Sequence, residues 1–222
     1  MLGAVIAYIY IVSCLIVSIT GAFLYRTEGK KFVRKVILFI WVYTLIEVSS
    51  KFVVAPLLRN TLWLFNGVIP VYFMLIGVIY CDFFEQNIRI RRLISISTIV
   101  FLLFYTANVL WMQDFYSKIY NYSIAAMSLF VVLCAFLYFH HKMRQPPAES
   151  LRSDAMFWVS SGLLIFYGAQ AFAMGSINYL NEVDRSTSSA VLSIVQGIGI
   201  LMNGMLLIGI LCQRNRMTSC SR

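Results

Sequence analysis

The chain has 222 residues, of which 60% are hydrophobic, 15% aromatic and 12% charged, and its mean hydropathy is +0.80. Soluble domains are about half apolar and about a quarter charged, so this composition excludes an ordinary soluble domain and indicates a membrane protein. The formal net charge is +9. Because the cations stand almost entirely between apolar runs, we expect no nucleic-acid partner.

Seven apolar runs are long enough to cross a bilayer, since a hydrocarbon core of about 30 Å needs about 20 apolar residues per helix. In chain order the expected helices span residues 2–24, 36–58, 62–80, 93–111, 122–139, 155–180 and 189–211. The connections are short, and the longest, His140 to Asp154, contains the pair Pro146 and Pro147. We therefore predict an all-α integral membrane protein in which residues 1–222 form one domain, a single bundle of seven transmembrane helices.

The distribution of Lys and Arg predicts how the bundle is oriented. Of the 18 such residues, fourteen follow the first, third, fifth and seventh runs, three lie in the other connections, and Lys51 lies inside a run. Connections rich in Lys and Arg stay in the cytoplasm. We therefore expect the N-terminus outside and the C-terminus in the cytoplasm. The first run has no basic segment before it and is longer than a signal-peptide core, so we expect it to be an anchor.

Two ionisable residues stand inside the second run, in the stretch IEVSSK at residues 46–51. Glu47 and Lys51 are four residues apart and would share one face of an α-helix, together with Tyr43 and Ser50. Counting about 1.5 Å per residue, Glu47 lies about 16 Å and Lys51 about 22 Å from the cytoplasmic boundary. A charge at the bilayer centre costs at least about 2.5 kcal/mol. This face is therefore expected to point into the bundle.

Other runs carry polar side chains at a similar depth. The same count places four amides within about 10 Å of the outer surface and one tyrosine level with Glu47; they are Asn66, Asn108, Gln170, Gln196 and Tyr72. Depth can be counted along a helix, but the direction in which a side chain points around it cannot. The meeting of these residues with Glu47 and Lys51 in one ligand or ion pocket is therefore a hypothesis.

Two interpretations of these polar residues stay open. In the structural one, Glu47 is protonated or paired with Lys51, and the amides form hydrogen bonds between helices. In the functional one, the residues form a ligand, ion or proton site in the outer half of the bundle, as ionisable residues within membranes commonly do. We favour the functional interpretation.

Residues for several other chemistries are missing or badly spaced. The last run has no lysine to hold retinal, and the chain has no HExxH, no GxSxG and no Gly-rich phosphate loop. His140 and His141 are adjacent, so they cannot share a helix face, and a metal site needs more ligands. Asp82 and Glu85 are followed closely by three arginines, which we expect to neutralise them. We therefore expect no catalytic residue, no cofactor and no bound metal.

The sixth and seventh runs are rich in small residues. Pairs four apart, such as Ala171 with Gly175 and Ser193 with Gly197, let helix backbones approach closely in a membrane. Close packing of these two helices is the expected role.

The sixth run also carries a resemblance. DAMFWVSSGLLIFYGAQAF, residues 154–172, resembles the FW-x-x-SG-x-LIY-type segment of small seven-helix bacterial inner-membrane proteins of uncharacterised function, which are often encoded beside sensor histidine kinases. The similarity extends to TLIEVSS in the second run, LWLFN at the start of the third, and LCQRNR after the seventh. In the third run IPVYF stands where a glutamate-containing aromatic segment is more usual. The resemblance implies the bacterial cytoplasmic (inner) membrane and a sensory or accessory role.

Taken together, these features favour a receptor-like or accessory sensor that signals through a separate cytoplasmic or membrane partner. The expected partners are the lipid bilayer, a small-molecule ligand, and a histidine kinase or another membrane protein. One alternative is a small-solute or proton-coupled transporter, which needs a polar path to the cytoplasm through Ser160, Ser161 and Asn203. A second alternative, a lipid-modifying enzyme, needs Asp82, Glu85 and His140 to meet at the headgroup level.

Overall fold

The computed structural model describes residues 2–25, 31–58, 60–112, 114–116, 119–144 and 151–220. The Pro146 and Pro147 pair lies outside these described residues. So do five of the cations on which the predicted orientation rests, namely Arg26, Lys30, Arg59, Lys118 and Arg222.

Every regular element in the described part of the chain is helical. In order they are α1 (Leu2–Tyr25), α2 (Lys31–Ser49), η1 (Ser50–Val54), α3 (Ala55–Leu58), α4 (Leu62–Phe83), α5 (Ile88–Ala107), η2 (Asn108–Met112), α6 (Asn121–Met143), η3 (Leu151–Ser153), α7 (Ala155–Val183) and α8 (Arg185–Cys220). The elements η1 and η2 are π-helical turns and η3 is a 3-10 turn. The elements α2, η1 and α3 are continuous, as are α5 and η2. Within the described residues seven helices are therefore long and apolar enough to cross a membrane, as the sequence predicts.

The helices extend past the ends of the apolar runs. The helix α2 begins at Lys31 rather than residue 36, α5 begins at Ile88 rather than residue 93, and α6 ends at Met143 rather than residue 139. The added residues include several Lys and Arg, which are good helix formers. The length of an apolar run indicates only the part of a helix that is suited to a hydrocarbon core. The hydrogen bonds of the helix backbone can continue through charged residues on either side of that run.

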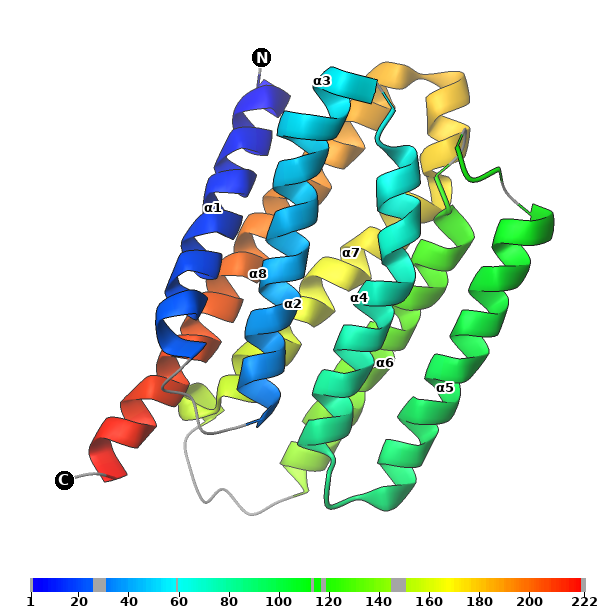
Figure 1. Cartoon of the computed structure of the whole chain (residues 1–222). Coiled ribbons are helices and arrows are strands. Elements are labelled where there is room, and N and C mark those ends of the chain that lie inside the picture. The colour runs from blue at the N-terminus through cyan, green and yellow to red at the C-terminus, as the bar shows by residue number, and fades with distance from the viewer. Residues whose placement is uncertain are drawn as a thin grey trace.

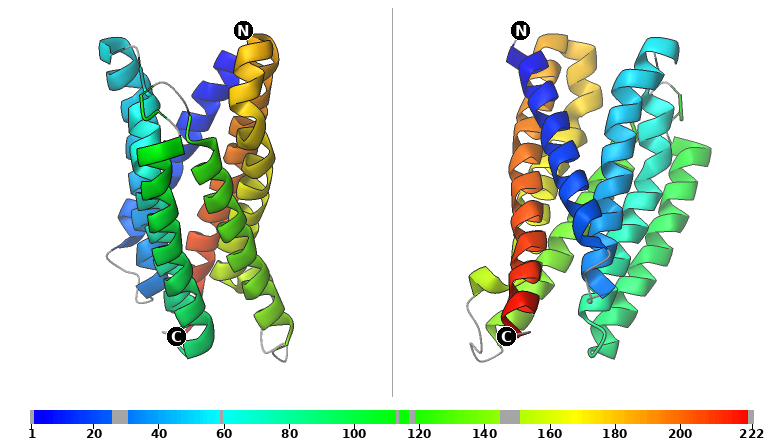
Figure 2. Two further views of the ribbon diagram at one scale, coloured as in Figure 1. Left: turned by 90° about the vertical axis from the view of Figure 1, so that its right-hand side faces the viewer. Right: turned by 60° about the vertical axis from the view of Figure 1, so that its left-hand side comes forward.

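Six of the seven long helices of the described residues form a closed ring. Going round it, α1 packs against α2, α2 against α4, α4 against α6, α6 against α7, α7 against α8, and α8 against α1. The helix α5 lies outside the ring against α4 and α6, and it is the least buried of the seven. The views in Figure 2 show α2, α4 and α5 on one side of the bundle and α7 and α8 on the other.

The two ends of the bundle are built differently. The end drawn uppermost in Figure 1, called the upper end here, carries the start of α1, α3 and the turn between α7 and α8. The opposite, lower end carries the turn between α4 and α5 and the end of α8. By the charge pattern, the upper end is the predicted outer side.

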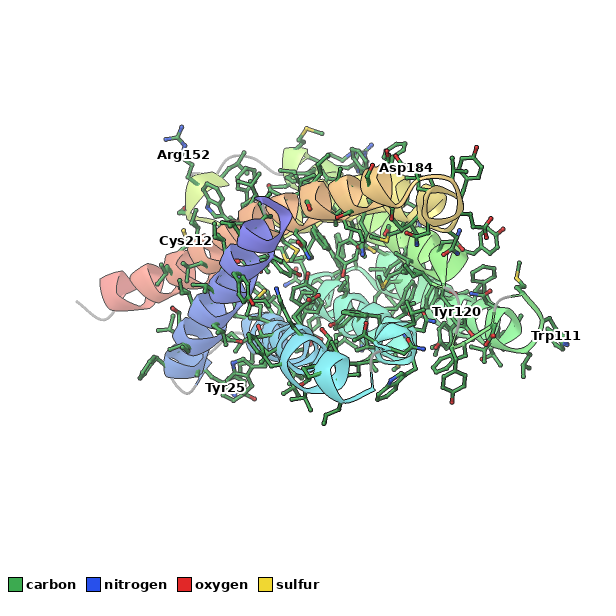
Figure 3. The ribbon with its side chains drawn as sticks, turned by 90° about the horizontal axis from the view of Figure 1, so that it is seen from above. Tyr25, Trp111, Tyr120, Arg152, Asp184 and Cys212 are labelled. Atoms are coloured by element: carbon green, nitrogen blue, oxygen red, sulfur yellow. The ribbon has the colours of Figure 1, made fainter. Side chains whose placement is uncertain are left out.

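Asp184 closes the upper turn as the residue before α8. Its carboxylate accepts hydrogen bonds from the hydroxyl groups of Thr187 and Ser186 and from the backbone N–H of Ser186. These bonds, that of Thr187 foremost, lower the pKa of Asp184 from its ordinary 3.8 to about 2. Figure 3 shows the residue from above, on the turn between the two helices.

Ion pairs join helices at the lower end. Lys35 Nζ on α2 lies 2.6 Å from Asp82 Oδ2 on α4, and Lys142 Nζ lies 2.8 Å from Asp154 Oδ2. Asp82 is thus neutralised, but by a lysine of a neighbouring helix and not by the arginines that follow it in sequence. The packing of α2 against α4 places the Lys35 ammonium within ion-pair distance of Asp82.

Glycine does allow α7 and α8 to approach closely, but at positions other than the predicted ones. A Cβ atom at Gly162 would lie 3.3 Å from the carbonyl oxygen of Met202, and one at Gly209 would lie 3.0 Å from that of Ala155. At Gly175 and Gly197 a Cβ atom would meet nothing within 4 Å. Spacing by four thus marks small residues but does not say which of them face the partner helix.

Candidate functional site: a pocket in the upper half of the bundle

A pocket of about 390 Å³ lies inside the ring of helices. All six ring helices line it and none of its lining residues comes from α5. Its lining comprises Tyr10, Tyr43, Glu47, Thr61, Leu62, Phe65, Val68, Ile69, Tyr72, Ile119, Ile124, Met127, Phe166, Tyr167, Gln170, Met174, Leu192, Val195 and Gln196.

The pocket runs from the upper end of the bundle to about its middle. Thr61 and Leu62 at the start of α4 stand at its upper level. Glu47 and Tyr72 lie about 16 Å below the upper ends of their own helices at 1.5 Å per residue. The part at the level of Glu47 is called the floor of the pocket here.

Glu47 is held at the floor by α1. The hydroxyl of Tyr10 donates a hydrogen bond to Glu47 Oε1 at 3.3 Å, and the hydroxyls of Tyr10 and Tyr43 are hydrogen-bonded to each other. The Ser50 hydroxyl donates to the backbone carbonyl of Glu47 at 2.9 Å. The Glu47 side chain itself is half-buried and lines the pocket.

Aromatic rings from four helices gather around this carboxylate. The ring centroid of Tyr43 on α2 lies 6.3 Å from that of Tyr10 on α1, 5.6 Å from that of Tyr72 on α4 and 6.5 Å from that of Phe166 on α7. The contacts with Tyr10 and Phe166 are edge to face, a favourable geometry for aromatic pairs. The floor is therefore a carboxylate surrounded by tyrosine and phenylalanine rings.

Two polar groups of the lining residues are buried without a hydrogen-bond partner in the described part of the chain. They are the hydroxyl of Tyr72 and the side-chain carbonyl oxygen of Gln170. Buried polar groups in proteins are nearly always hydrogen-bonded. Both residues line the pocket, so an occupant of the pocket is a natural source for the missing partners.

Four of the seven residues predicted for the site line this one pocket: Glu47, Tyr72, Gln170 and Gln196. They come from α2, α4, α7 and α8, four different helices. Counting along the apolar runs places them between the middle and the predicted outer end of the bundle, and the packing of the ring brings them to one cavity.

Lys51 lies elsewhere. Its Nζ stands 4.1 Å from the centroid of the Tyr8 ring on α1, and it is neither a lining residue nor within ion-pair distance of Glu47. The backbone changes at Ser50 to the wider π-helical turn, in which the N–H of Ala55 donates to the carbonyl of Ser50. The α-helical rule that residues four apart share a face does not carry through such a turn.

Asn66 and Asn108 also lie outside the pocket lining and join elements of the bundle instead. The Asn66 amide donates to the carbonyl of Phe115 at 3.0 Å, and its side-chain oxygen accepts from the N–H of Tyr120 at 3.0 Å. The Asn108 amide on η2 donates to the Ser123 hydroxyl on α6 at 2.8 Å. The contacts of these two residues are those of the structural interpretation, in which the amides form hydrogen bonds that join parts of the bundle.

Three aromatic residues of the pocket lining, Tyr10, Phe166 and Tyr167, could not be singled out from the sequence. They stand in apolar runs, where one aromatic residue resembles another, whereas Tyr43 stands four residues before Glu47. Gly199 on α8 offers an indirect signal, because a Cβ there would lie 2.6 Å from Cε2 of Tyr10. Only glycine leaves room for that ring.

Below the floor the bundle is packed. Phe39, Phe73 and Ile76 are fully buried there, and the Tyr80 hydroxyl donates to the buried Ser160 hydroxyl at 3.2 Å. The Asn203 amide donates to the Ser13 hydroxyl at 2.8 Å. Ser160 and Asn203, candidates for a path to the lower end, are thus used in contacts between helices.

The four residues considered for metal or hydrolytic chemistry, Asp82, Glu85, His140 and His141, do not line the pocket. No three His, Cys, Asp or Glu side chains among them gather into a possible metal site. The ring of His141 packs against Phe84 with centroids 5.5 Å apart, and Asp82 is paired with Lys35.

Comparisons of the chain with protein families, with curated proteins and with solved structures find no match. The resemblance to small seven-helix bacterial proteins stays a prediction.

Proposed function

We propose that this protein is a receptor-like membrane protein whose pocket binds a small molecule that enters from the predicted outer side. The observation that carries the proposal is the pocket of about 390 Å³ that is lined by all six ring helices and ends at Glu47. Sites for small molecules are concave, about 300 to 1,000 Å³ in volume, and mostly apolar with a few placed polar groups. This pocket has that size and that character.

The position of the pocket suits a receptor because an occupant would touch both sides of the bundle. Tyr72 and Glu47 lie on the side formed by α2 and α4, whereas Gln170 and Gln196 lie on the side formed by α7 and α8. A ligand that binds one packing of these sides more tightly shifts the bundle toward that packing. The lower ends of the helices would then pass the movement to a separate partner, for which a histidine kinase or another membrane protein is our proposal.

A transporter fits the same residues less well. A carrier needs a route from the pocket to the other side of the membrane. The packed residues below the floor and the use of Ser160 and Asn203 in helix contacts support a pocket with one entrance. Uptake into proteoliposomes that depends on Glu47 would favour the carrier.

The proposal is tested by measuring movement at the lower end. Nitroxide labels are placed at the exposed positions Glu85 and Leu151, as Glu85→Cys and Leu151→Cys, in a background whose five native cysteines are replaced by alanine. Pulsed electron–electron double resonance then gives the distance between the two labels in lipid nanodiscs. The probes are 4-phenylbutylamine, 4-phenylbutanol and 4-phenylbutyrate, which share one apolar body and differ in charge.

At least one probe is expected to bind and to shift the distance distribution. Val195→Trp, which places a large ring in the pocket lining, serves as the control and should abolish both binding and shift. Binding without any change in distance would contradict a receptor that signals by helix movement. No binding by any of the three probes would contradict the pocket as a ligand site.

A further inference from the structure

The charge of the pocket points to one sign of ligand. Among the lining residues Glu47 is the single carboxylate, and the lining contains no Lys, Arg or His. The nearest cation in sequence, Lys51, is turned onto the ring of Tyr8. An ionised Glu47 would therefore face the pocket with no cation of the described residues within ion-pair distance, an arrangement that costs energy inside a membrane unless a further cation binds.

The hydrogen bonding of Glu47 leaves acceptor capacity free. A carboxylate has two oxygens and about four acceptor positions. Within the described residues Glu47 accepts one side-chain hydrogen bond, from Tyr10 at 3.3 Å, a distance longer than that of a strong bond. The carboxylate can thus accept further donors from an occupant of the pocket.

The surrounding rings favour the same charge. The rings of Tyr10, Tyr72 and Phe166 surround that of Tyr43 at the floor, with centroids 5.6 to 6.5 Å from its own. The face of an aromatic ring carries partial negative charge and attracts ammonium groups, and such attraction strengthens where water is excluded. A carboxylate among aromatic rings is a site for an ammonium ion rather than for an anion.

The unpartnered groups distinguish among ammonium ions. The buried side-chain oxygen of Gln170 can only accept, and the buried hydroxyl of Tyr72 can accept as well as donate. Together with Glu47 they offer three acceptors on α2, α4 and α7. The ammonium of a primary amine carries three N–H donors, whereas a quaternary ammonium carries none.

The rest of the pocket is apolar. Above the floor its walls include Phe65, Val68, Ile124, Met127 and Leu192. This region would cover an apolar body attached to the amine. A ligand would therefore lie with its ammonium group at Glu47 and its apolar part toward the upper end.

We propose that the pocket recognises a small amphipathic molecule with a single protonated amine, primary or secondary, bound by Glu47 at a floor of tyrosine rings. This assignment rests on the proposed function, since it names the ligand class of the same pocket. It excludes carboxylates, which Glu47 would repel, and it ranks quaternary ammonium ions below amines.

The test compares four probes with one body: 4-phenylbutylamine, 4-phenylbutanol, 4-phenylbutyrate and N,N,N-trimethyl-4-phenylbutylammonium. Dissociation constants are measured by calorimetry at pH 7 with the full chain in nanodiscs of zwitterionic lipid, so that no anionic surface attracts the amines. The amine should bind about tenfold tighter than the alcohol, since a charge-assisted hydrogen bond is roughly twice as strong as a neutral one. The trimethylammonium probe should bind more weakly than the amine.

Two variants locate the effect. Glu47→Gln should remove the preference for the amine over the alcohol while the alcohol still binds, which also shows that the variant is folded. Glu182→Gln removes an exposed carboxylate at the end of α7, outside the pocket lining, and should leave the preference intact.

The outcomes separate this inference from the proposed function. Equal or tighter binding of the alcohol or the acid, or a preference for the amine that survives Glu47→Gln, would overturn the amine assignment and leave the pocket as a ligand site. Trimethylammonium binding equal to that of the amine would overturn the role of the N–H donors. Binding by none of the four would overturn both.

Discussion

The hydroxyl of Tyr10 on α1 donates to the carboxylate of Glu47 on α2 at 3.3 Å, and this bond ties the first two helices together at the floor of the pocket. The same hydroxyl is hydrogen-bonded to Tyr43. A buried chain of this kind fixes the position of the carboxylate as well as stabilising the bundle.

Tyr10→Phe should keep the ring packing and remove these hydrogen bonds. We expect the free energy of unfolding to fall by about 1 kcal/mol, the usual net value of a buried hydrogen bond, measured by thermal unfolding in detergent. Tyr8→Phe is the matched control, because Tyr8 is an exposed tyrosine of the same helix. An equal effect of both substitutions would show that the Tyr10 hydroxyl contributes nothing specific.

Gly199→Ala should destabilise the protein by about 1 to 3 kcal/mol, the range for overpacking a filled interior. The added Cβ would lie 2.6 Å from the Tyr10 ring, so either the ring or the helix must shift. Gly204→Ala on the same helix is the control, since a Cβ there would meet nothing within 4 Å. Steric-trap or denaturant unfolding in bicelles compares the two variants, and similar stabilities would contradict the observed contact.

Lys51→Gln should change the affinity for 4-phenylbutylamine less than Glu47→Gln does, because Lys51 does not line the pocket and faces the ring of Tyr8. Glu47→Gln should weaken the same binding about tenfold, as one charge-assisted hydrogen bond is lost. Calorimetry in nanodiscs measures both. A Lys51→Gln effect as large as that of Glu47→Gln would restore the two residues as a functional pair.

The cap of α8 should depend on pH. Hydrogen bonds from Thr187 and Ser186 lower the pKa of Asp184 from 3.8 to about 2, so the folded state binds its proton less readily than the unfolded state. The stabilisation is therefore fully present above about pH 4 and is lost as the pH falls to about 2. Hydrogen exchange of the Ser186, Thr187 and Ser188 amides, divided by its intrinsic rate, should become faster as the pH falls from about 4 to about 2. Asp184→Ala should remove this dependence on pH.

The predicted orientation can be checked with single cysteines at two exposed positions. Ser186→Cys at the upper end should react with a membrane-impermeant maleimide applied to intact spheroplasts, because the positive-inside rule places that end outside. Glu85→Cys at the lower end should react only after permeabilisation. The reverse pattern would place the pocket entrance in the cytoplasm.

The sequence by itself determined the number of helices and the ends of their apolar parts. Long apolar runs have one stable solution in a membrane, since every backbone group must be hydrogen-bonded within its own helix. It also singled out Glu47, because a lone acidic residue in such a run has to face the protein interior. Tyr72, Gln170 and Gln196 followed from counting depth.

The tertiary structure decided which of these residues share a pocket. Direction around a helix depends on how neighbouring helices pack, and no count along the chain supplies it. The packing places Asn66 and Asn108 in hydrogen bonds between elements. At the π-helical turn that begins at Ser50, Lys51 lies against the ring of Tyr8. The packing also brought Tyr10 against Gly199, some 190 residues away in sequence, because a ring of helices places α1 beside α8.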